Sequence, residues 1–153
     1  MKTEEMQNVG EILEAMNFRY QYREETQTIN LAMSSQKGTY GLTFDAHGGR
    51  VLKVSGTMNH IVPEGSRTDI ALAVARANYG MMAGFFDFGV DEGDLRFRYL
   101  ISLANGTPSR EQLEFAMSMV LFLLDRYVPA FMSIIYANTP PKEAISSAEC
   151  VAA

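Results

Sequence analysis

Cysteine, histidine and tryptophan are scarce in this chain: it has one cysteine, two histidines and no tryptophan among 153 residues. A single cysteine, Cys150, cannot form an internal disulfide, which is typical of a protein in a reducing compartment. His47 and His60 have no second histidine at helical spacing and no cysteine nearby, so the sequence predicts no zinc site. We expect both histidines to lie in solvent-exposed loops.

Basic residues are also few, with 13 Lys and Arg against 18 Asp and Glu, which gives a formal net charge of −5. Because nucleic-acid binding needs clustered basic side chains, we expect no nucleic-acid partner. The start of the chain lacks the apolar run of a signal peptide. The most apolar run, residues 115–124, supplies about half of the ~20 residues that a membrane span needs. We therefore expect a cytoplasmic protein without a membrane-spanning segment.

The motifs of common enzyme classes are missing as well. The sequence has no glycine-rich phosphate loop and no nucleophile elbow. Asp87 and the acidic turn at residues 91–94 form the strongest metal candidate by charge, but they lack the alternating spacing and the distant glutamate of a calcium loop. A plain hairpin turn is favoured for this segment. We predict no catalytic residue, no cofactor and no metal site, and we expect a protein that is not an enzyme.

The composition is that of an ordinary folded protein, with 47% hydrophobic and 20% charged residues. The length suits one domain with a sizeable core. We assign residues 1–138 to a single domain. Residues 139–153 follow a break at Asn138-Thr139-Pro140-Pro141 and are expected to be a tail with at most one short helical turn.

The segment from Thr107 to Tyr136 is predicted to be a long helix. Thr107 is the expected N-cap, and Pro108 suits the first helical position. Apolar residues recur at steps of three or four on one face, namely Leu113, Met117, Val120, Leu124, Val128, Phe131 and Ile135. Pro129 should bend the helix and release the carbonyl of Asp125 from its helical hydrogen bond.

The rest of the chain predicts an antiparallel sheet and two shorter helices. An amphipathic pattern indicates a helix over residues 4–17, and another helix is expected between Ser66 and Gly80. Alternation with period two predicts strands over residues 18–23, 28–34, 39–45, 50–58, 86–90 and 95–103. The predicted class is therefore α+β, in the order αββββαββα, with helices packed on one face of the sheet.

Two arginines, Arg96 and Arg98, are expected on the polar face of the last strand. Together they could bind an anion, such as a phosphate or an acidic partner segment. The alternative is that they are solvated arginines, because the exposed face of a sheet needs polar side chains in any case.

The long helix carries more apolar side chains than one face of the sheet can cover. Phe115, Met119 and Phe122 project away from the main stripe, and a helix that is apolar nearly all round is usually covered on more than one side. We predict a homodimer in which these side chains are covered by the partner subunit, or alternatively by the helix at residues 4–17. Arg126 lies in the same patch and either pairs across that interface or forms a local salt bridge with Asp125.

Several segments resemble one protein family. They are residues 78–84, Phe86, Phe88, residues 91–98, Thr107-Pro108, residues 125–130 and residues 139–145. Their order and spacing are similar to those of the YbjN-domain family, which is proposed to regulate bacterial sensory transduction. The resemblance implies a fold like that of type III secretion chaperones, which are often dimeric and bind extended segments of partner proteins. Its motifs are structural and carry no catalytic residue.

The leading hypothesis is a non-enzymatic interaction module, either a chaperone-like protein or a regulatory adaptor, that binds a protein or peptide segment. The alternative is a small-ligand sensor or enzyme with an anion site near Arg96 and Arg98. A deep pocket with converging polar groups would favour the alternative, and a shallow exposed groove would favour the interaction module.

Overall fold

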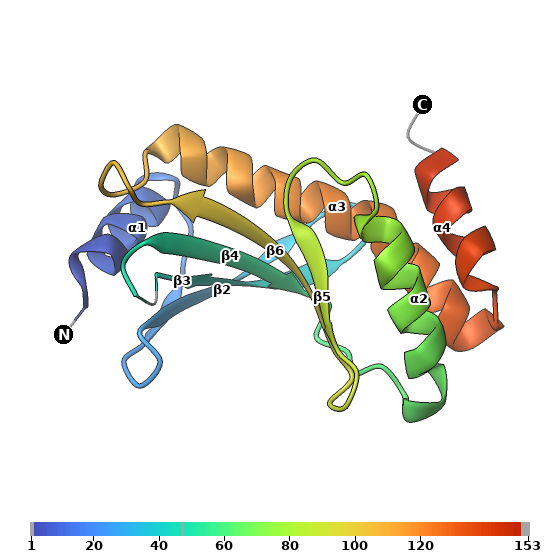
Figure 1. The fold of residues 1–153 in the computed structure, drawn as a ribbon. Coiled ribbons are helices and arrows are strands. Elements are labelled where there is room, and N and C mark those ends of the chain that lie inside the picture. The colour runs from blue at the N-terminus through green and yellow to red at the C-terminus, as the bar shows by residue number, and fades with distance from the viewer. Residues whose placement is uncertain (1, 47, 151–153) are drawn as a thin grey trace.

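The computed structural model describes residues 2–46 and 48–150, in which helices and strands form an α+β fold (Figure 1). The elements are α1 (Glu4–Ala15), β1 (Gln21–Arg23), β2 (Thr28–Ser34), β3 (Thr39–Asp45), β4 (Val51–Thr57), the 3-10 helix η1 (Glu64–Ser66), α2 (Arg67–Asn78), β5 (Phe85–Gly89), β6 (Asp94–Ser102), α3 (Arg110–Ala137) and α4 (Pro141–Cys150). The predicted fold class is confirmed. The tail was expected to hold one helical turn at most, but it contains the ten-residue helix α4.

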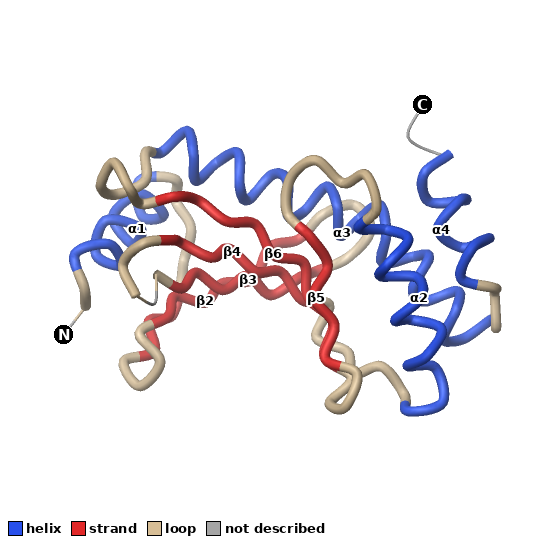
Figure 2. Tube along the Cα trace, in the orientation of Figure 1, coloured by secondary structure: helices blue, strands red, loops and turns tan. Residues whose placement is uncertain are grey.

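The strands form one antiparallel sheet in the order β1-β2-β3-β4-β6-β5 (Figure 2). Apolar side chains alternate along the strands and are buried on the face that the helices cover: Ile29, Leu31, Tyr40, Leu42, Phe44, Leu52, Val54, Leu95, Phe97 and Ile101. The helix α3 packs on β4 and β6, and α2 packs on β5. The other face of the sheet carries mostly polar and charged side chains, with Phe85 and Leu100 as exposed apolar exceptions.

The first strand is shorter than predicted, because Phe18 completes the end of α1 and the pairing with β2 begins only at Gln21. Asn17 adopts the left-handed conformation, with φ of 63°, and the Phe18 N–H donates to the Leu13 carbonyl at 2.9 Å. Both features are typical of a helix C-terminus whose last carbonyl groups are satisfied by the chain that follows.

The helix α3 begins later than predicted. Its N-cap is Ser109, not Thr107, and Pro108 precedes the cap. Ser109 Oγ accepts a hydrogen bond from the Gln112 N–H at 3.2 Å, while Gln112 Oε1 accepts one from the Ser109 N–H at 2.9 Å. This reciprocal capping box satisfies two backbone donors, one of them an otherwise unpaired N–H of the first helical turn.

The buried stripe of α3 matches the prediction over its first half and rotates over its second. Val128 and Ile135 are only partly buried, whereas Tyr127, Ala130 and Ile134 are buried. The reason is that α3 passes from the sheet to a contact with α2 and α4. By length and hydropathy α3 is long and apolar enough to cross a membrane, as the core helix of a soluble protein also is. In this fold its buried stripe packs in the core.

Candidate functional site

The outer side of α3 carries a half-exposed apolar ridge, which we call the α3 ridge and define as Phe115, Met119 and Phe122. Phe115 and Phe122 are each 54% exposed, and Met119 is partly buried. Met119 packs against the edge of the core beside these two exposed side chains. The expectation that the helix at residues 4–17 covers this ridge is wrong, because α1 packs against β2 and leaves both rings half exposed.

The ridge leads into an apolar groove between α3 and α4. This α3–α4 groove has a volume of about 670 Å³. Its lining comprises Phe122, Asp125, Arg126, Pro129, Ala130 and Ser133 of α3, Thr139, Glu143, Ala144, Ser147 and Ala148 in and before α4, and Lys37. Apolar atoms make up most of that lining, which also includes the charged side chains of Lys37, Asp125, Arg126 and Glu143. Such a lining suits an apolar segment with polar flanks.

Arg126 holds one wall of the groove in place. Its Nε donates to the Ala148 carbonyl at 3.3 Å, and its Nη2 donates to the Glu149 carbonyl at 3.1 Å. These carbonyls belong to the last turn of α4, where the C=O groups have no N–H partner within the helix. The negative end of the helix dipole also favours a nearby cation. Within the described residues the hydrogen bonds of this guanidinium thus go to α4, and not to Asp125 as the local alternative required.

Asp125 fixes α3 to the turn between β2 and β3. Its Oδ1 accepts hydrogen bonds from the Ser35 hydroxyl at 2.6 Å and from the Tyr40 hydroxyl at 2.7 Å. Burial of Tyr40, followed by its hydrogen bond to Asp125 and the charge of that carboxylate, raises the pKa of Tyr40 to about 12. The sequence indicated Asp125 only as a polar residue in an apolar helix, since its partners lie far away in the chain.

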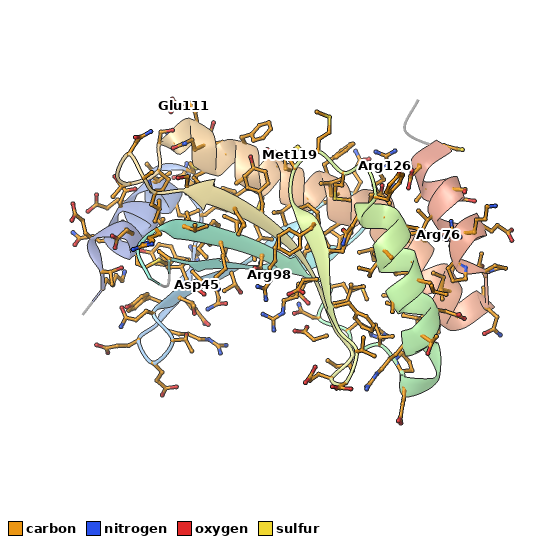
Figure 3. The ribbon with its side chains drawn as sticks, viewed as in Figure 1. Asp45, Arg76, Arg98, Glu111, Met119 and Arg126 are labelled. Atoms are coloured by element: carbon orange, nitrogen blue, oxygen red, sulfur yellow. The ribbon has the colours of Figure 1, made fainter. Side chains whose placement is uncertain are left out.

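Arg96 and Arg98 lie on the open face of the sheet, as predicted, but each is paired with a carboxylate. Arg96 Nε is 2.6 Å from Asp94 Oδ2, and Arg98 Nη2 is 3.0 Å from Asp87 Oδ2. Figure 3 shows Arg98 on the side of the sheet opposite α3. Guanidinium groups that are already paired with carboxylates attract a further anion less than unpaired ones would. The geometry therefore weakens the alternative of an anion site.

The remaining polar candidates do not converge on a reactive centre. His60 Nε2 is 2.7 Å from the Tyr136 hydroxyl, and His47 lies outside the described residues. Among residues 2–46 and 48–150 no three His, Cys, Asp or Glu side chains gather in a way that could hold a metal ion. The acidic hairpin turn uses Asp94 to pair with Arg96.

Comparison with known families gives a match over most of the chain. The model of the family YbjN, described as "Putative bacterial sensory transduction regulator", matches residues 6–133. This chain belongs to the YbjN family. The resemblance seen in the sequence is confirmed, and the match includes the strands of the N-terminal half.

A solved structure of a YbjN protein has the same fold. The chain is similar to "Crystal structure of YbjN, a putative transcription regulator from E. coli", with 14% sequence identity over 87% of this chain and 90% of that chain, and a TM-score of 0.60. A search of curated proteins found no match. The YbjN family match ends at residue 133, so α4 and one wall of the α3–α4 groove lie beyond the matched residues.

Proposed function

We propose that this YbjN-family protein is a non-enzymatic regulatory module of the cytoplasm that acts through protein contacts as a homodimer. The description of the family supports a regulatory role. The observation that carries the proposal is the α3 ridge, which leaves Phe115 and Phe122 each 54% exposed beside an apolar groove. Aromatic side chains and methionine are enriched at protein interfaces.

The α3 ridge suits a two-fold interface. In such a dimer the same patch of both subunits meets, so each ridge residue contributes to the interface once from each subunit. Covering the exposed half of a phenylalanine side chain gains about 1 kcal/mol, since complete burial is worth roughly 1.5–3 kcal/mol. The two Phe122 rings, with Met119 from each subunit, would form an apolar centre for the interface. Phe115 would stand at its rim, beside β6, where its ring lies 6.0 Å from that of Tyr99.

The α3–α4 groove is the proposed binding place for a partner protein segment. Its largely apolar lining, with charged side chains of both signs, fits a segment with alternating apolar and polar side chains better than a small anion. A chaperone-like protein and a regulatory adaptor would both use such a groove. The alternative of an anion-binding sensor or enzyme has less support, because Arg96 and Arg98 are already paired with Asp94 and Asp87.

Sedimentation velocity tests the dimer. The wild-type protein should sediment as a dimer at micromolar concentration, and Phe122→Asp should sediment as a folded monomer because a buried carboxylate at the interface has no partner. Leu72→Asp is the matched control, since Leu72 is also 54% exposed and lies on a helix away from the ridge. A monomeric wild-type protein, or a dimeric Phe122→Asp variant, would show that the ridge is not a subunit interface.

Photo-crosslinking in the native cell tests the groove. A photoreactive amino acid at Ser133, in the groove, should capture a partner protein. The same residue at Ser55, on the open face of the sheet, should not. Capture only from Ser55 would place the partner on the sheet and contradict binding in the groove.

A further inference from the structure

The last part of β6 is a free edge of the sheet. β6 lies between β4 and β5, but β5 pairs only with residues 94–98. Residues 99–102 pair with β4 on one side and have no strand on the other within the described part of the chain. In Figure 2 this half of β6 forms the border of the sheet as it runs toward the start of α3.

The register shows which backbone groups point out of this edge. The Leu103 N–H donates to the Arg50 carbonyl at 2.8 Å, so residues 103, 101 and 99 turn their N–H and C=O groups toward β4. In an antiparallel ladder alternate residues face opposite neighbours. Leu100 and Ser102 therefore direct two N–H donors and two C=O acceptors outward, at the spacing of a strand.

The neighbouring edge is closed in a way that this one is not. On the outer side of β5, Asn78 Nδ2 donates to the Phe86 carbonyl at 2.9 Å, and the Phe86 N–H donates to Asn78 Oδ1 at 2.7 Å. The side-chain amide of Asn78 thus occupies the outward N–H and C=O groups of Phe86, so that no further strand can pair with β5 at this residue. Covering an edge in this way protects it from pairing with another chain. No side chain of residues 2–46 or 48–150 closes the edge at Leu100 and Ser102 in this way.

A hollow with suitable side chains runs along the free edge. It has a volume of about 380 Å³ and is lined only by β6 and the start of α3, through Tyr99, Leu100, Ile101, Ser102, Glu111, Gln112 and Phe115. Phe115 is 54% exposed, and the centroid of its ring lies 6.0 Å from that of the Tyr99 ring. An added strand would place alternate side chains against these rings.

We propose that an extended peptide segment of a partner protein binds here as an additional antiparallel strand on residues 100–102. This inference rests on the proposed interaction function and gives it a binding mode and a place separate from the α3–α4 groove. The segment carries an apolar residue facing Phe115 and a basic residue near Glu111. Arg110 pairs with Glu114 at 2.8 Å, which leaves Glu111 as the carboxylate available to a basic side chain.

A second copy of the chain fits this edge less well. Two-fold pairing of β6 with itself, centred on Ile101, would bring both Glu111 carboxylates to the same face near the axis, where like charges repel. The net charge of −5 adds to that repulsion. A neutral or basic peptide avoids it.

The probe is the synthetic peptide acetyl-Lys-Thr-Val-Thr-Val-amide. Antiparallel to β6, its threonines lie opposite Ser102 and Leu100 and turn their N–H groups toward the edge. Its valines turn their side chains to Phe115 and their N–H groups away, and its lysine lies near Glu111. Binding is followed by shifts of the amide NMR signals of Leu100 and Ser102.

Two isomers of the peptide form the control. N-methylation of both threonines removes the donors that face β6 and should weaken binding about tenfold or more, because two backbone hydrogen bonds are lost. N-methylation of both valines leaves those donors intact and should change binding little. Binding of equal strength by both isomers, or shifts that map to the α3–α4 groove, would overturn the edge site.

Protein variants complete the test. Leu100→Pro removes an outward N–H without breaking the pairing to β4 and should abolish binding, whereas Leu100→Val should retain it. If Leu100→Pro does not fold, the two peptide isomers on the wild-type protein decide. No amide shift with the unmodified peptide at millimolar concentration overturns the site, and so does a wild-type dimer that Leu100→Pro converts to a monomer. Failure of the proposed dimer is seen separately, in the sedimentation of Phe122→Asp.

Discussion

The side-chain ammonium of Lys37 lies 3.4 Å from the backbone carbonyl oxygen of Asp125. Four residues later α3 contains Pro129, which has no N–H to donate to that carbonyl. Lys37 therefore supplies a donor where the helix lacks one. The carboxylate of the same aspartate accepts from Ser35 and Tyr40, so the β2–β3 turn and the proline region of α3 form one structural unit.

Removal of the Asp125 carboxylate should destabilise the fold. In Asp125→Ala the Tyr40 hydroxyl, on a residue only 3% exposed, loses its acceptor, and we expect the free energy of unfolding to fall by about 2 kcal/mol. Tyr40→Phe keeps the ring and should cost about 1 kcal/mol. Urea denaturation measures both, with Ser118→Ala on the exposed side of α3 as the control. A loss in Asp125→Ala no larger than in Ser118→Ala would show that the carboxylate does not stabilise the turn.

The same contact predicts how stability depends on pH. Because the pKa of Tyr40 is raised to about 12 in the folded protein, from about 10 in the unfolded chain, the folded state holds this proton more tightly. Its contribution to stability is present in full below pH ~10 and is lost as the pH rises through about 12. Denaturation at a series of alkaline pH values should show a decline that Tyr40→Phe reduces. An identical decline in both proteins would contradict the assignment.

The sequence was sufficient for the sheet and for most of α3. Alternating apolar residues such as Leu42 and Phe44 are a local signal, and burial on one face follows directly from it. The ridge at Phe115 and Phe122 also followed, since a wide apolar surface on one helix is visible without tertiary information. The cap at Ser109 was missed because Thr107-Pro108 offers a similar signal two residues earlier, and only the reciprocal bonds with Gln112 decide between them.

The contacts that shape the candidate groove could not be predicted in this way. Asp125 and Ser35 are 90 residues apart in the sequence, and no local pattern links a mid-helix carboxylate to a distant turn. The role of Arg126 depends on α4, and the two prolines at residues 140 and 141 indicated a break. Pro141 instead begins the helix, in the first turn, where its missing N–H costs nothing.

Loss of the Asn78 amide should open the edge of β5. Asn78→Ala leaves the N–H and C=O of Phe86 without their partners, and we expect the free energy of unfolding to fall by about 2 kcal/mol. Asn78→Asp keeps an acceptor for the Phe86 N–H and should lose less. Amide hydrogen exchange at Phe86 should accelerate in Asn78→Ala while exchange at Leu42, in the centre of the sheet, changes no more than global stability requires. Unchanged exchange at Phe86 would show that the amide does not protect this edge.

The close approach of α3 to β4 depends on Gly56. A Cβ atom at this position would lie 2.5 Å from Val120 Cγ1 and 2.6 Å from Leu124 Cδ1. Gly56→Ala should therefore push α3 away from the sheet and lower the free energy of unfolding by roughly 1–3 kcal/mol. Gly65→Ala is the control, because an added Cβ there has no atom within 4 Å. Equal stability of the two variants in urea would show that the helix tolerates the added methyl group.

A double variant separates crowding from any effect of alanine on the strand itself. Val120→Ala removes the methyl groups nearest to the new Cβ, so Gly56→Ala combined with Val120→Ala should be less destabilised than the sum of the single variants. If crowding also shifts α3 along its length, the association of the two subunits should weaken in Gly56→Ala and recover in the double variant. Sedimentation velocity measures the fraction of dimer in each. Additive losses would mean that the contact between Gly56 and Val120 does not set the position of α3.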